Sequence, residues 1–291
     1  MLTFTANRAW HGNKYIDPNE SGAVLPILHL NGFKISERTI FGCMDDRELA
    51  CLFSGYGYQP CFVEDLENID TDLNAALNWA VNEIHGIQRA ARAGHPITKP
   101  RWPMIVLRTP KGWGCPKKMH GEWIEGSFRA HQVPLPNAKS DSTELGALQD
   151  WLLSYGPKEL FPSGHLCETA QQILPQHKYK RLGQNPVYWH GRKDLNVPEW
   201  KGYALQKDSE ASSLKSAGAY LNQALYSNKH SLRIFSPDEL VSNKLDAVFE
   251  HTSRNFQWDQ YSKGRGGQVI EILSEHTCQG KFPLHCQRNS N

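Results

Sequence analysis

The sequence predicts an α/β protein in which parallel sheets are flanked by helices, and three observations support this. The nearly continuous apolar run Ala23 to Leu30 has the composition of a strand buried on both faces. The segment Asp72 to Ala93 repeats apolar residues at helical spacing and stops at Gly94. The apolar run Pro103 to Leu107 then follows, and this alternation of strand and helix favours a parallel sheet with right-handed crossovers.

The other elements of the first half are indicated by their ends. Asp45 and Glu48 have the spacing of a capping box, which predicts a helix from Asp46 to Phe53 that stops at Gly55. Short strand character follows at Tyr58 to Val63.

Further along, Ser142 to Tyr155 is expected to form a helix with Leu145, Leu148 and Leu152 on one stripe. The prolines and polar residues that follow predict a linker that separates two parts. We expect residues 1–155 to form the first part, 156–201 the linker and 202–291 the second part. The second part is expected to contain a helix, a strand, a helix and a strand at Ser213 to Leu225, Ser231 to Phe235, Asp238 to Phe249 and Gln268 to Leu273.

Composition and charge argue against several classes of protein. The formal net charge of +2 gives no electrostatic basis for binding nucleic acid or an anionic membrane. No apolar run approaches the roughly 20 residues of a membrane span, and the first residues lack the apolar core of a signal peptide, so a cytoplasmic protein is expected. Seven cysteines without CxxC spacing predict reduced, mostly buried thiols. A metal site at His276 and Cys278, or at His285 and Cys286, is the weaker alternative.

Three polar residues of the first half stand where predicted strands end. Asn31 follows the first apolar run directly, and Lys111 and His131 flank a Gly/Pro loop after Leu107. Open α/β sheets bind ligands outside the carboxyl ends of their strands, and Lys with His suits an anionic substrate and proton transfer. Each residue also has an ordinary explanation, because Asn-Gly forms turns for backbone reasons alone and a lone Lys or His is commonly structural or solvated.

Two candidates lie in the second half. Glu239 would stand near the carboxyl end of a strand, where a ligand could meet its carboxylate. A helix cap also explains this glutamate without a ligand, because Ser236 suits the N-cap and Glu239 then falls at the capping-box position. The capping role and the ligand-binding role are compatible. Tyr261 lies in a basic, glycine-rich loop that could hold phosphate through backbone N–H groups, although such loops are commonly only exposed. The sequence contains neither a P-loop nor a dinucleotide-binding fingerprint.

Seven segments resemble the phosphoketolases, which are thiamine-diphosphate enzymes. They occur in the same order and cover nearly the whole chain: Ala9 to Pro18, Gly22 to Ile35, Gly55 to Glu64, Arg101 to Trp113, Ser127 to Leu135, Arg233 to Glu250 and Val269 to Gly280. The resemblance implies the thiamine-diphosphate-binding fold. Residues 1–155 would be the later part of a diphosphate-binding domain, and residues 202–291 the first part of a pyrimidine-binding domain.

The resemblance also implies roles for individual residues. The Asn31 side chain and the Phe33 backbone carbonyl match ligands of the Mg²⁺ that holds the cofactor's diphosphate. Lys111 and His131 match active-site residues that contact cofactor or substrate, Lys111 on the cofactor side and His131 in catalysis. Glu239 matches the catalytic glutamate that hydrogen-bonds the aminopyrimidine ring of thiamine diphosphate.

The implied reaction is the phosphorolytic cleavage of xylulose 5-phosphate or fructose 6-phosphate to acetyl phosphate and an aldose phosphate. Its partners would be a ketose phosphate, inorganic phosphate and a second subunit in a homodimer. Neither nucleic acid nor a membrane is expected as a partner. Tyr261 matches a tyrosine that contacts the substrate.

The chain also departs from the family pattern. The residues before Ala9 lack the family's GDG motif with its Asp ligand for Mg²⁺, the string GWGCPK differs from the usual GWTGPK, and the resemblance stops near Gly280. The chain is therefore expected to be a central fragment of two incomplete domains with impaired turnover. Two alternatives stay open: an inactive remnant that at most pairs with a full-length subunit, and a transketolase-like protein, which the strings RTPKGW and SFRAHQVPL disfavour.

Overall fold

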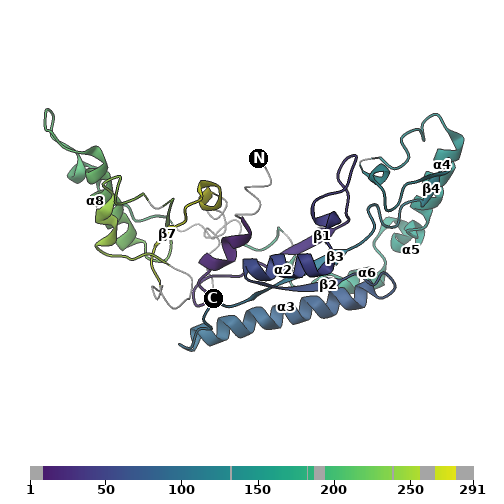
Figure 1. Ribbon diagram of the computed structural model, residues 1–291, viewed down its shortest axis with the longest axis horizontal. Coiled ribbons are helices and arrows are strands. Elements are labelled where there is room, and N and C mark those ends of the chain that lie inside the picture. Colours follow the sequence, from purple (N-terminus) through teal and green to yellow (C-terminus); the bar gives the residue numbers. More distant parts are fainter. Residues whose placement is uncertain are drawn as a thin grey trace. The chain divides into compact units, whose positions relative to one another are not determined.

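The computed structural model describes residues 9–131, 133–181, 183–186, 194–237, 239–255 and 266–279, which fall into two compact units (Figure 1). The first unit contains residues 25–80 and 103–184. The second contains residues up to 24, residues 81–102 and those from 185 onward. Each unit has a parallel β-structure of its own, which agrees with the predicted α/β class.

The first unit is built on a three-stranded sheet with the order β1-β3-β2. Its strands are β1 (Ile27–Leu30), β2 (Tyr58–Val63) and β3 (Trp102–Arg108). β1 and β3 are parallel, with Ile27 opposite Ile105. The central strand β3 is the most buried, because it has a neighbour on each side. The strands expected at residues 58–63 and 103–107 are therefore confirmed.

The strand expected from Ala23 onward is shorter and more exposed than predicted. β1 begins only at Ile27, whose side chain is exposed, and Leu30 is its one buried residue. The physical reason is the strand order, since among the described strands β1 lies at an edge of the sheet rather than between two neighbours. Pro26 fits this position, because it has no N–H to donate while its carbonyl still accepts a bond from the Ile105 N–H.

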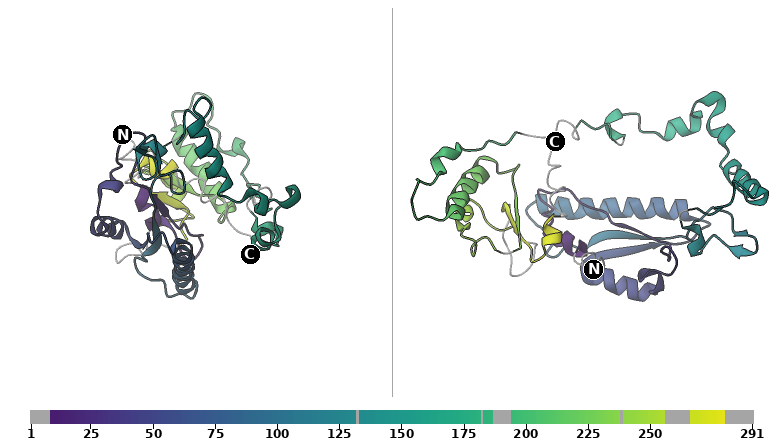
Figure 2. Two further views of the ribbon diagram at one scale, coloured as in Figure 1. Left: turned by 90° about the vertical axis from the view of Figure 1, so that its right-hand side faces the viewer. Right: turned by 90° about the horizontal axis from the view of Figure 1, so that it is seen from above.

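Helices α2 (Asp46–Tyr56) and α3 (Ile69–Arg92) lie on opposite faces of this sheet (Figures 1 and 2). The predicted capping box at the start of α2 is present in both directions between Asp45 and Glu48. The helix continues past Gly55 and ends at Gly57, because Gly57, with φ +96°, is the residue that adopts the left-handed conformation.

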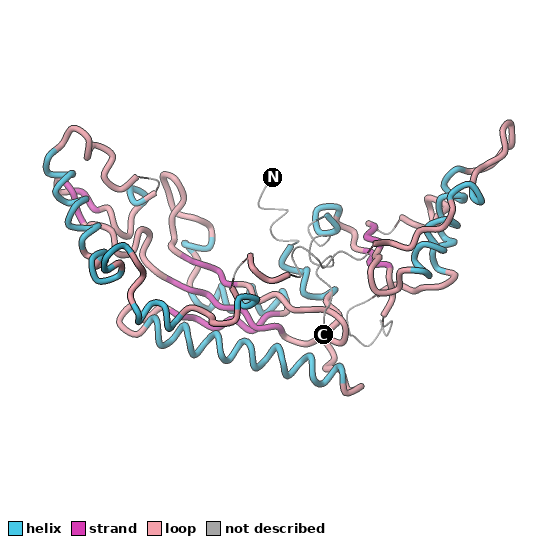
Figure 3. The backbone as a smooth tube through the Cα atoms, turned by 180° about the vertical axis from the view of Figure 1, so that it is seen from behind, coloured by secondary structure: helices cyan, strands magenta, loops and turns pink. Residues whose placement is uncertain are grey.

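The first half of α3 packs along one face of the sheet (Figure 3). Ile69 and Ala76 from the helix join Val63 and Ile105 from the strands in one buried cluster. Leu73 and Leu77 of the apolar repeat that predicted this helix pack against the same cluster.

The rest of the first unit consists of short elements. They are the 3-10 turn η2 (Phe41–Cys43), the hairpin β4 (Lys118–Met119) and β5 (Glu122–Trp123), the turn η3 (Phe128–Ala130), helices α4 (Ser142–Leu153), α5 (Pro157–Leu160) and α6 (Glu168–Ile173), and the turns η4 (Pro162–Gly164) and η5 (Lys178–Lys180). The segment that was expected to be an extended linker thus contains helical turns. Leu148 of α4 packs against a core that contains Cys115, whereas Leu145 and Leu152 of its predicted stripe are exposed.

The second unit pairs the parallel strands β6 (Ile234–Ser236) and β7 (Val269–Glu271). Helix α8 (Ser213–Ser227) and the turn η7 (Asp246–Phe249) contribute to a core with Leu225 and Val248. The unit also contains the turns η1 (Trp10–Tyr15) and η6 (Trp200–Tyr203) and a short helix that begins at Glu275. The helix expected at residues 213–225 is confirmed and is two residues longer.

The prediction of a helix from Asp238 to Phe249 is wrong. The cap is present, since the Glu239 N–H donates to Ser236 Oγ at 3.2 Å, but only turns and η7 follow it. The interruption has a backbone cause. Lys244 adopts φ +62°, and the Leu245 N–H bonds the Leu240 carbonyl five residues back, which is incompatible with continued α-helix.

None of the helices in the described ranges has both the length and the apolar composition that a membrane crossing requires.

The cysteines are less buried than predicted. Among the described residues six cysteines are free. Cys43 and Cys51 are exposed, and only Cys115 and Cys278 are buried. The sequence rule fails here because Cys43 lies in the turn η2 and Cys51 lies on an exposed face of α2, outside the core of the sheet.

These thiols are expected to differ in reactivity. Burial raises the pKa of the Cys115 thiol, and the nearby Glu125 carboxylate raises it further. Because the thiolate is the reacting form, we expect iodoacetamide to alkylate Cys115 at least about tenfold more slowly than Cys43 in the folded protein. Timed labelling followed by peptide mass spectrometry measures both rates, and a urea-unfolded sample, in which the rates should converge, is the control. Equal rates in the folded protein would contradict the burial of Cys115.

Candidate functional site

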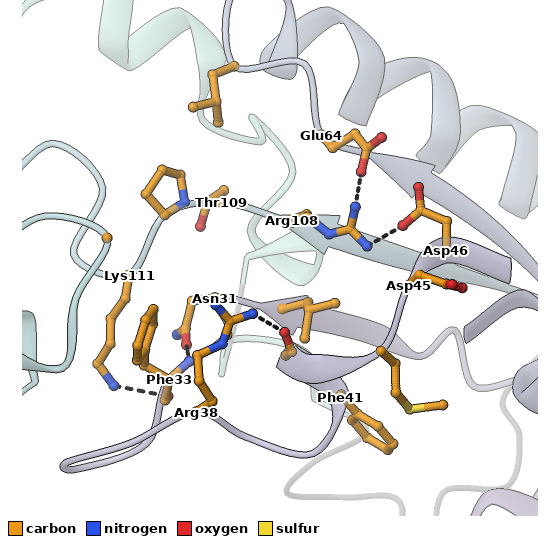
Figure 4. A pocket seen from close by; sticks show the side chains of 17 residues that line it. Asn31, Phe33, Arg38, Phe41, Asp45, Asp46, Glu64, Arg108, Thr109 and Lys111 are labelled. Carbon is orange, nitrogen blue, oxygen red and sulfur yellow. Dashed lines mark hydrogen bonds and ion pairs between the residues drawn. The ribbon is translucent and has the colours of Figure 1, made fainter. Parts of the chain in front are cut away.

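A pocket of about 600 Å³ opens at the carboxyl ends of the strands in the first unit (Figure 4). Its walls include Asn31 after β1, Glu64 after β2, and Arg108 and Lys111 at and after the end of β3. This is the edge at which open α/β sheets bind ligands, and the volume is typical of small-molecule sites. The pocket therefore lies where the sequence predicted a ligand site.

Arg108 ties the elements around this pocket together. Its guanidinium forms ion pairs with Asp46, in the first turn of α2, and with Glu64, directly after β2 (Figure 4). The hydrogen bond that Arg108 donates to Asp46, followed by the charges of both carboxylates, raises the pKa of the Arg108 guanidinium. Arg108 thus fixes the start of α2 beside the ends of β2 and β3, and two carboxylates neutralise its charge.

Lys111 is a second cation of the pocket, and its surroundings are different. The residue is only 7% exposed. Its ammonium donates to the backbone carbonyls of Phe33 (3.1 Å) and Lys34 (3.3 Å) and lies 2.9 Å from His131 Nδ1. Within the described ranges no carboxylate forms an ion pair with it. A buried cation held only by neutral acceptors is costly, so the pocket favours an anionic ligand.

The loop that carries Lys111 is held in place by close packing at Gly112. Gly112 has φ +69°, and a Cβ on it would stand 2.4 Å from the Cβ of Ala130 and 3.1 Å from Cys115 Sγ. Only glycine allows the loop to approach the turn Phe128–Ala130 this closely. This packing places Lys111 beside His131, which follows that turn directly.

Asn31 and Phe33 supply oxygen atoms at the end of β1. The Asn31 side-chain oxygen accepts a hydrogen bond from the Phe33 N–H at 3.2 Å, and the Phe33 carbonyl accepts from Lys111 (Figure 4). Amide and carbonyl oxygens are ligands that Mg²⁺ takes, and a carbonyl has a second lone pair available. The donor chemistry therefore fits Mg²⁺, and the buried ammonium beside it fits the anionic group that such an ion would accompany.

The structure brings together four of the residues that the sequence singled out, namely Asn31, Phe33, Lys111 and His131. Glu239 belongs to the second unit, where it is exposed just after β6. Tyr261 lies outside the described residues.

Two functional candidates were missed. Glu275 begins a short helix after β7, and because β6 and β7 are parallel, it follows the same sheet edge as Glu239. The sequence contained a signal for Glu275, because Ser274 and Glu275 directly follow the apolar strand that was expected to run to Leu273. Arg108 had no sequence signal, because its partners are 62 and 44 residues away.

The family model of the XFP N-terminal domain matches residues 3–193, and that of D-xylulose 5-phosphate/D-fructose 6-phosphate phosphoketolase matches residues 215–284. The chain belongs to the phosphoketolase family. A probable phosphoketolase of Schizosaccharomyces pombe is 48% identical over 273 residues, which cover 94% of this chain and 33% of the relative. One from Nocardia farcinica is 42% identical over 285 residues, with 94% and 34% covered. The chain thus spans about a third of the length of these phosphoketolases.

The fold also resembles solved transketolases. A transketolase of Pichia stipitis in complex with sedoheptulose 7-phosphate superposes with a TM-score of 0.54 at 14% identity, covering 97% of this chain and 39% of that protein. A variant of the Pichia stipitis enzyme gives a TM-score of 0.53 at the same identity and coverage. At this identity the likeness concerns the fold alone, and it agrees with the α/β architecture that the phosphoketolase resemblance implied.

The packing at Gly112 leads to a stability prediction with a matched control. Gly112→Ala should lower the free energy of unfolding by about 2–4 kcal/mol, from a left-handed alanine and from overpacking against Ala130. Gly114→Ala should cost only roughly 1–2 kcal/mol, because Gly114 has φ +86° but open space around its Cβ position. Urea unfolding measures both variants, and a Gly112→Ala cost no larger than that of Gly114→Ala would argue against this packing.

Proposed function

We propose that this chain carries part of a phosphoketolase active site. The proposed reaction is the cleavage of xylulose 5-phosphate or fructose 6-phosphate by inorganic phosphate, with thiamine diphosphate and Mg²⁺, to acetyl phosphate and an aldose phosphate. The observation that carries the proposal is the buried Lys111 ammonium, which lacks a carboxylate partner among the described residues and faces a pocket at the strand ends. Membership of the phosphoketolase family supports the identity of the anion.

The residues of the first unit would divide the binding work. Lys111 would hold the diphosphate of the cofactor, and Asn31 Oδ1 with the Phe33 carbonyl would bind Mg²⁺. When bound, thiamine diphosphate supplies the nucleophilic carbon that attacks the ketose carbonyl. The packing of Gly112 keeps Lys111 oriented toward the Phe33 carbonyl.

His131 would serve in proton transfer, and its contact with Lys111 sets its tautomer. A lysine ammonium has donors only, so at 2.9 Å the Nδ1 atom of His131 must accept. The proton of the neutral ring then stands on Nε2. This leaves an Nε2–H group to donate to a substrate oxygen.

The second unit would supply the carboxylate that contacts the aminopyrimidine ring. We propose Glu239 for this role, and Glu275 is the alternative because it follows the neighbouring parallel strand at the same edge. Tyr261 stays a proposed substrate contact. We infer a diphosphate-binding part in residues 1–155, a linker in 156–201 and a pyrimidine-binding part in 202–291, with the functional enzyme a homodimer.

The role of Lys111 is tested by ligand-induced stabilisation. Thiamine diphosphate or pyrophosphate with Mg²⁺ should raise the melting temperature of the wild type. Lys111→Met should weaken this binding about tenfold or more, since a hydrogen bond to a charged group contributes about 1.5–3 kcal/mol. Without ligand, the variant should be as stable as the wild type, because the uncompensated buried charge is gone.

Lys117→Met is the matched control, since Lys117 is exposed six residues further along the chain. It should bind like the wild type. Undiminished diphosphate binding by Lys111→Met would remove the main support for the proposal.

Activity is best tested in two settings. For the chain alone, with Mg²⁺, thiamine diphosphate, phosphate and fructose 6-phosphate, we expect little acetyl phosphate, because the chain spans only about a third of the length of its phosphoketolase relatives. A chimera in which residues 9–279 replace the matching third of the Schizosaccharomyces pombe relative should form acetyl phosphate. A chimera that folds and binds thiamine diphosphate but forms none would contradict the proposed reaction.

The same chimera distinguishes the two carboxylates. Glu239→Gln and Glu275→Gln are compared for kcat and for thiamine diphosphate binding. Neutralising the carboxylate that contacts the pyrimidine should lower kcat about 10²–10⁴-fold, and neutralising the other should change kcat little. A small effect in Glu239→Gln with a large one in Glu275→Gln would reassign the role.

A further inference from the structure

A cluster of one imidazole and two carboxylates joins the tip of the β4–β5 hairpin to the start of α4. His120 Nε2 lies 2.8 Å from Asp141 Oδ2 and 3.7 Å from Glu144 Oε1, and the three atoms lie within 4.8 Å of one another. We propose that His120, Asp141 and Glu144 form a binding site for a transition-metal dication of the Zn²⁺ type. The site is separate from the pocket at the strand ends and does not depend on the proposed function.

The spacing of the donor atoms suits such an ion. Zn²⁺ binds histidine nitrogen and carboxylate oxygen at about 2.0–2.2 Å in a tetrahedral arrangement, which separates neighbouring ligands by about 3.3 Å. The distances of 2.8 and 3.7 Å from His120 lie on either side of this value, and the two carboxylate oxygens lie within 4.8 Å of each other, so small side-chain rotations would bring all three donors to coordinating distance. An imidazole with carboxylates is also a set that Zn²⁺ accepts, whereas Mg²⁺ and Ca²⁺ prefer oxygen ligands alone.

Both carboxylates are held in position by other groups. Asp141 uses Oδ1 to cap α4, accepting from the backbone N–H of Thr143 (2.8 Å) and of Glu144 (3.3 Å), which leaves Oδ2 toward His120. Glu144 accepts from the backbone N–H of Asn137 at 2.6 Å and from its side-chain amide at 3.1 Å. Such supporting hydrogen bonds orient ligands around protein-bound metals.

The charge of the cluster favours a cation. Glu144 has a side chain that is only 3% exposed, and within the described ranges His120 is the one group that forms an ion pair with Asp141 or Glu144. Two carboxylates facing one imidazole leave an excess of negative charge.

The cluster is also accessible. The side chain of His120 is 53% exposed, so water or a further ligand can complete the coordination of a bound ion. A bound ion would close the segment between residues 120 and 141, which carries His131. We therefore expect it to stabilise the fold around that histidine.

The test titrates the full chain with Co²⁺ as a spectroscopic probe and then with Zn²⁺ as competitor. The wild type should bind one equivalent of Co²⁺ with visible bands, without the near-ultraviolet band that sulfur ligands produce, and Zn²⁺ should displace it. His120→Asn removes one ligand and keeps the turn, because Asn tolerates the left-handed backbone that His120 adopts at φ +49°. This variant should bind at least about tenfold more weakly.

Two further variants keep the test decisive if His120→Asn disturbs the hairpin. Asp141→Asn retains a good helix cap but is a poorer ligand, and it should also weaken binding. His95→Asn changes an exposed histidine outside the cluster and should bind like the wild type. Equal Co²⁺ affinity in the wild type and His120→Asn, or a spectrum dominated by sulfur ligation, would overturn the site and leave an ion pair between the hairpin and α4.

Discussion

The buried ammonium of Lys111 is the constraint around which the pocket of the first unit is arranged. A cation in this position needs acceptors from several directions, and the structure supplies them from the segment after β1 and from His131. Gly112 permits this arrangement by allowing the loop to pack against Ala130. Because these acceptors are neutral, they stabilise the ammonium charge of Lys111 without neutralising it. An anion that enters the pocket would therefore meet a charge that is already oriented.

The order of the strands explains how one segment can supply two cations with different roles. β3 lies between β1 and β2, so residues at its carboxyl end can reach either neighbour. Arg108 turns toward the β2 side and pairs with Glu64 and Asp46, whereas Lys111 reaches the Phe33 carbonyl on the β1 side. The first contact fixes the wall of the pocket, and the second leaves charge available inside it.

Local patterns predicted what depends on local spacing. The strand at residues 58–63, the capping box at Asp45 and the helix that begins at Ser213 all follow from neighbouring residues, and all are present. The exposure of β1 depends on the strand order, which its own residues do not encode. The helix expected after Ser236 fails at one left-handed residue, Lys244. In the site, Asn31, Phe33, Lys111 and His131 lie together, and their roles stay predictions from the resemblance. The ion pairs of Arg108 join residues too distant in sequence for any spacing rule to reveal.

The position of β1 has a practical consequence. Within the described residues its outer side has no strand partner, so backbone donors and acceptors on that side can template the addition of an extended peptide. The main-chain hydrogen bonds of such β-augmentation do not depend on side-chain identity, so self-association at high concentration is a hazard of handling the chain. A short extended peptide that occupies this side would then act as a solubilising reagent.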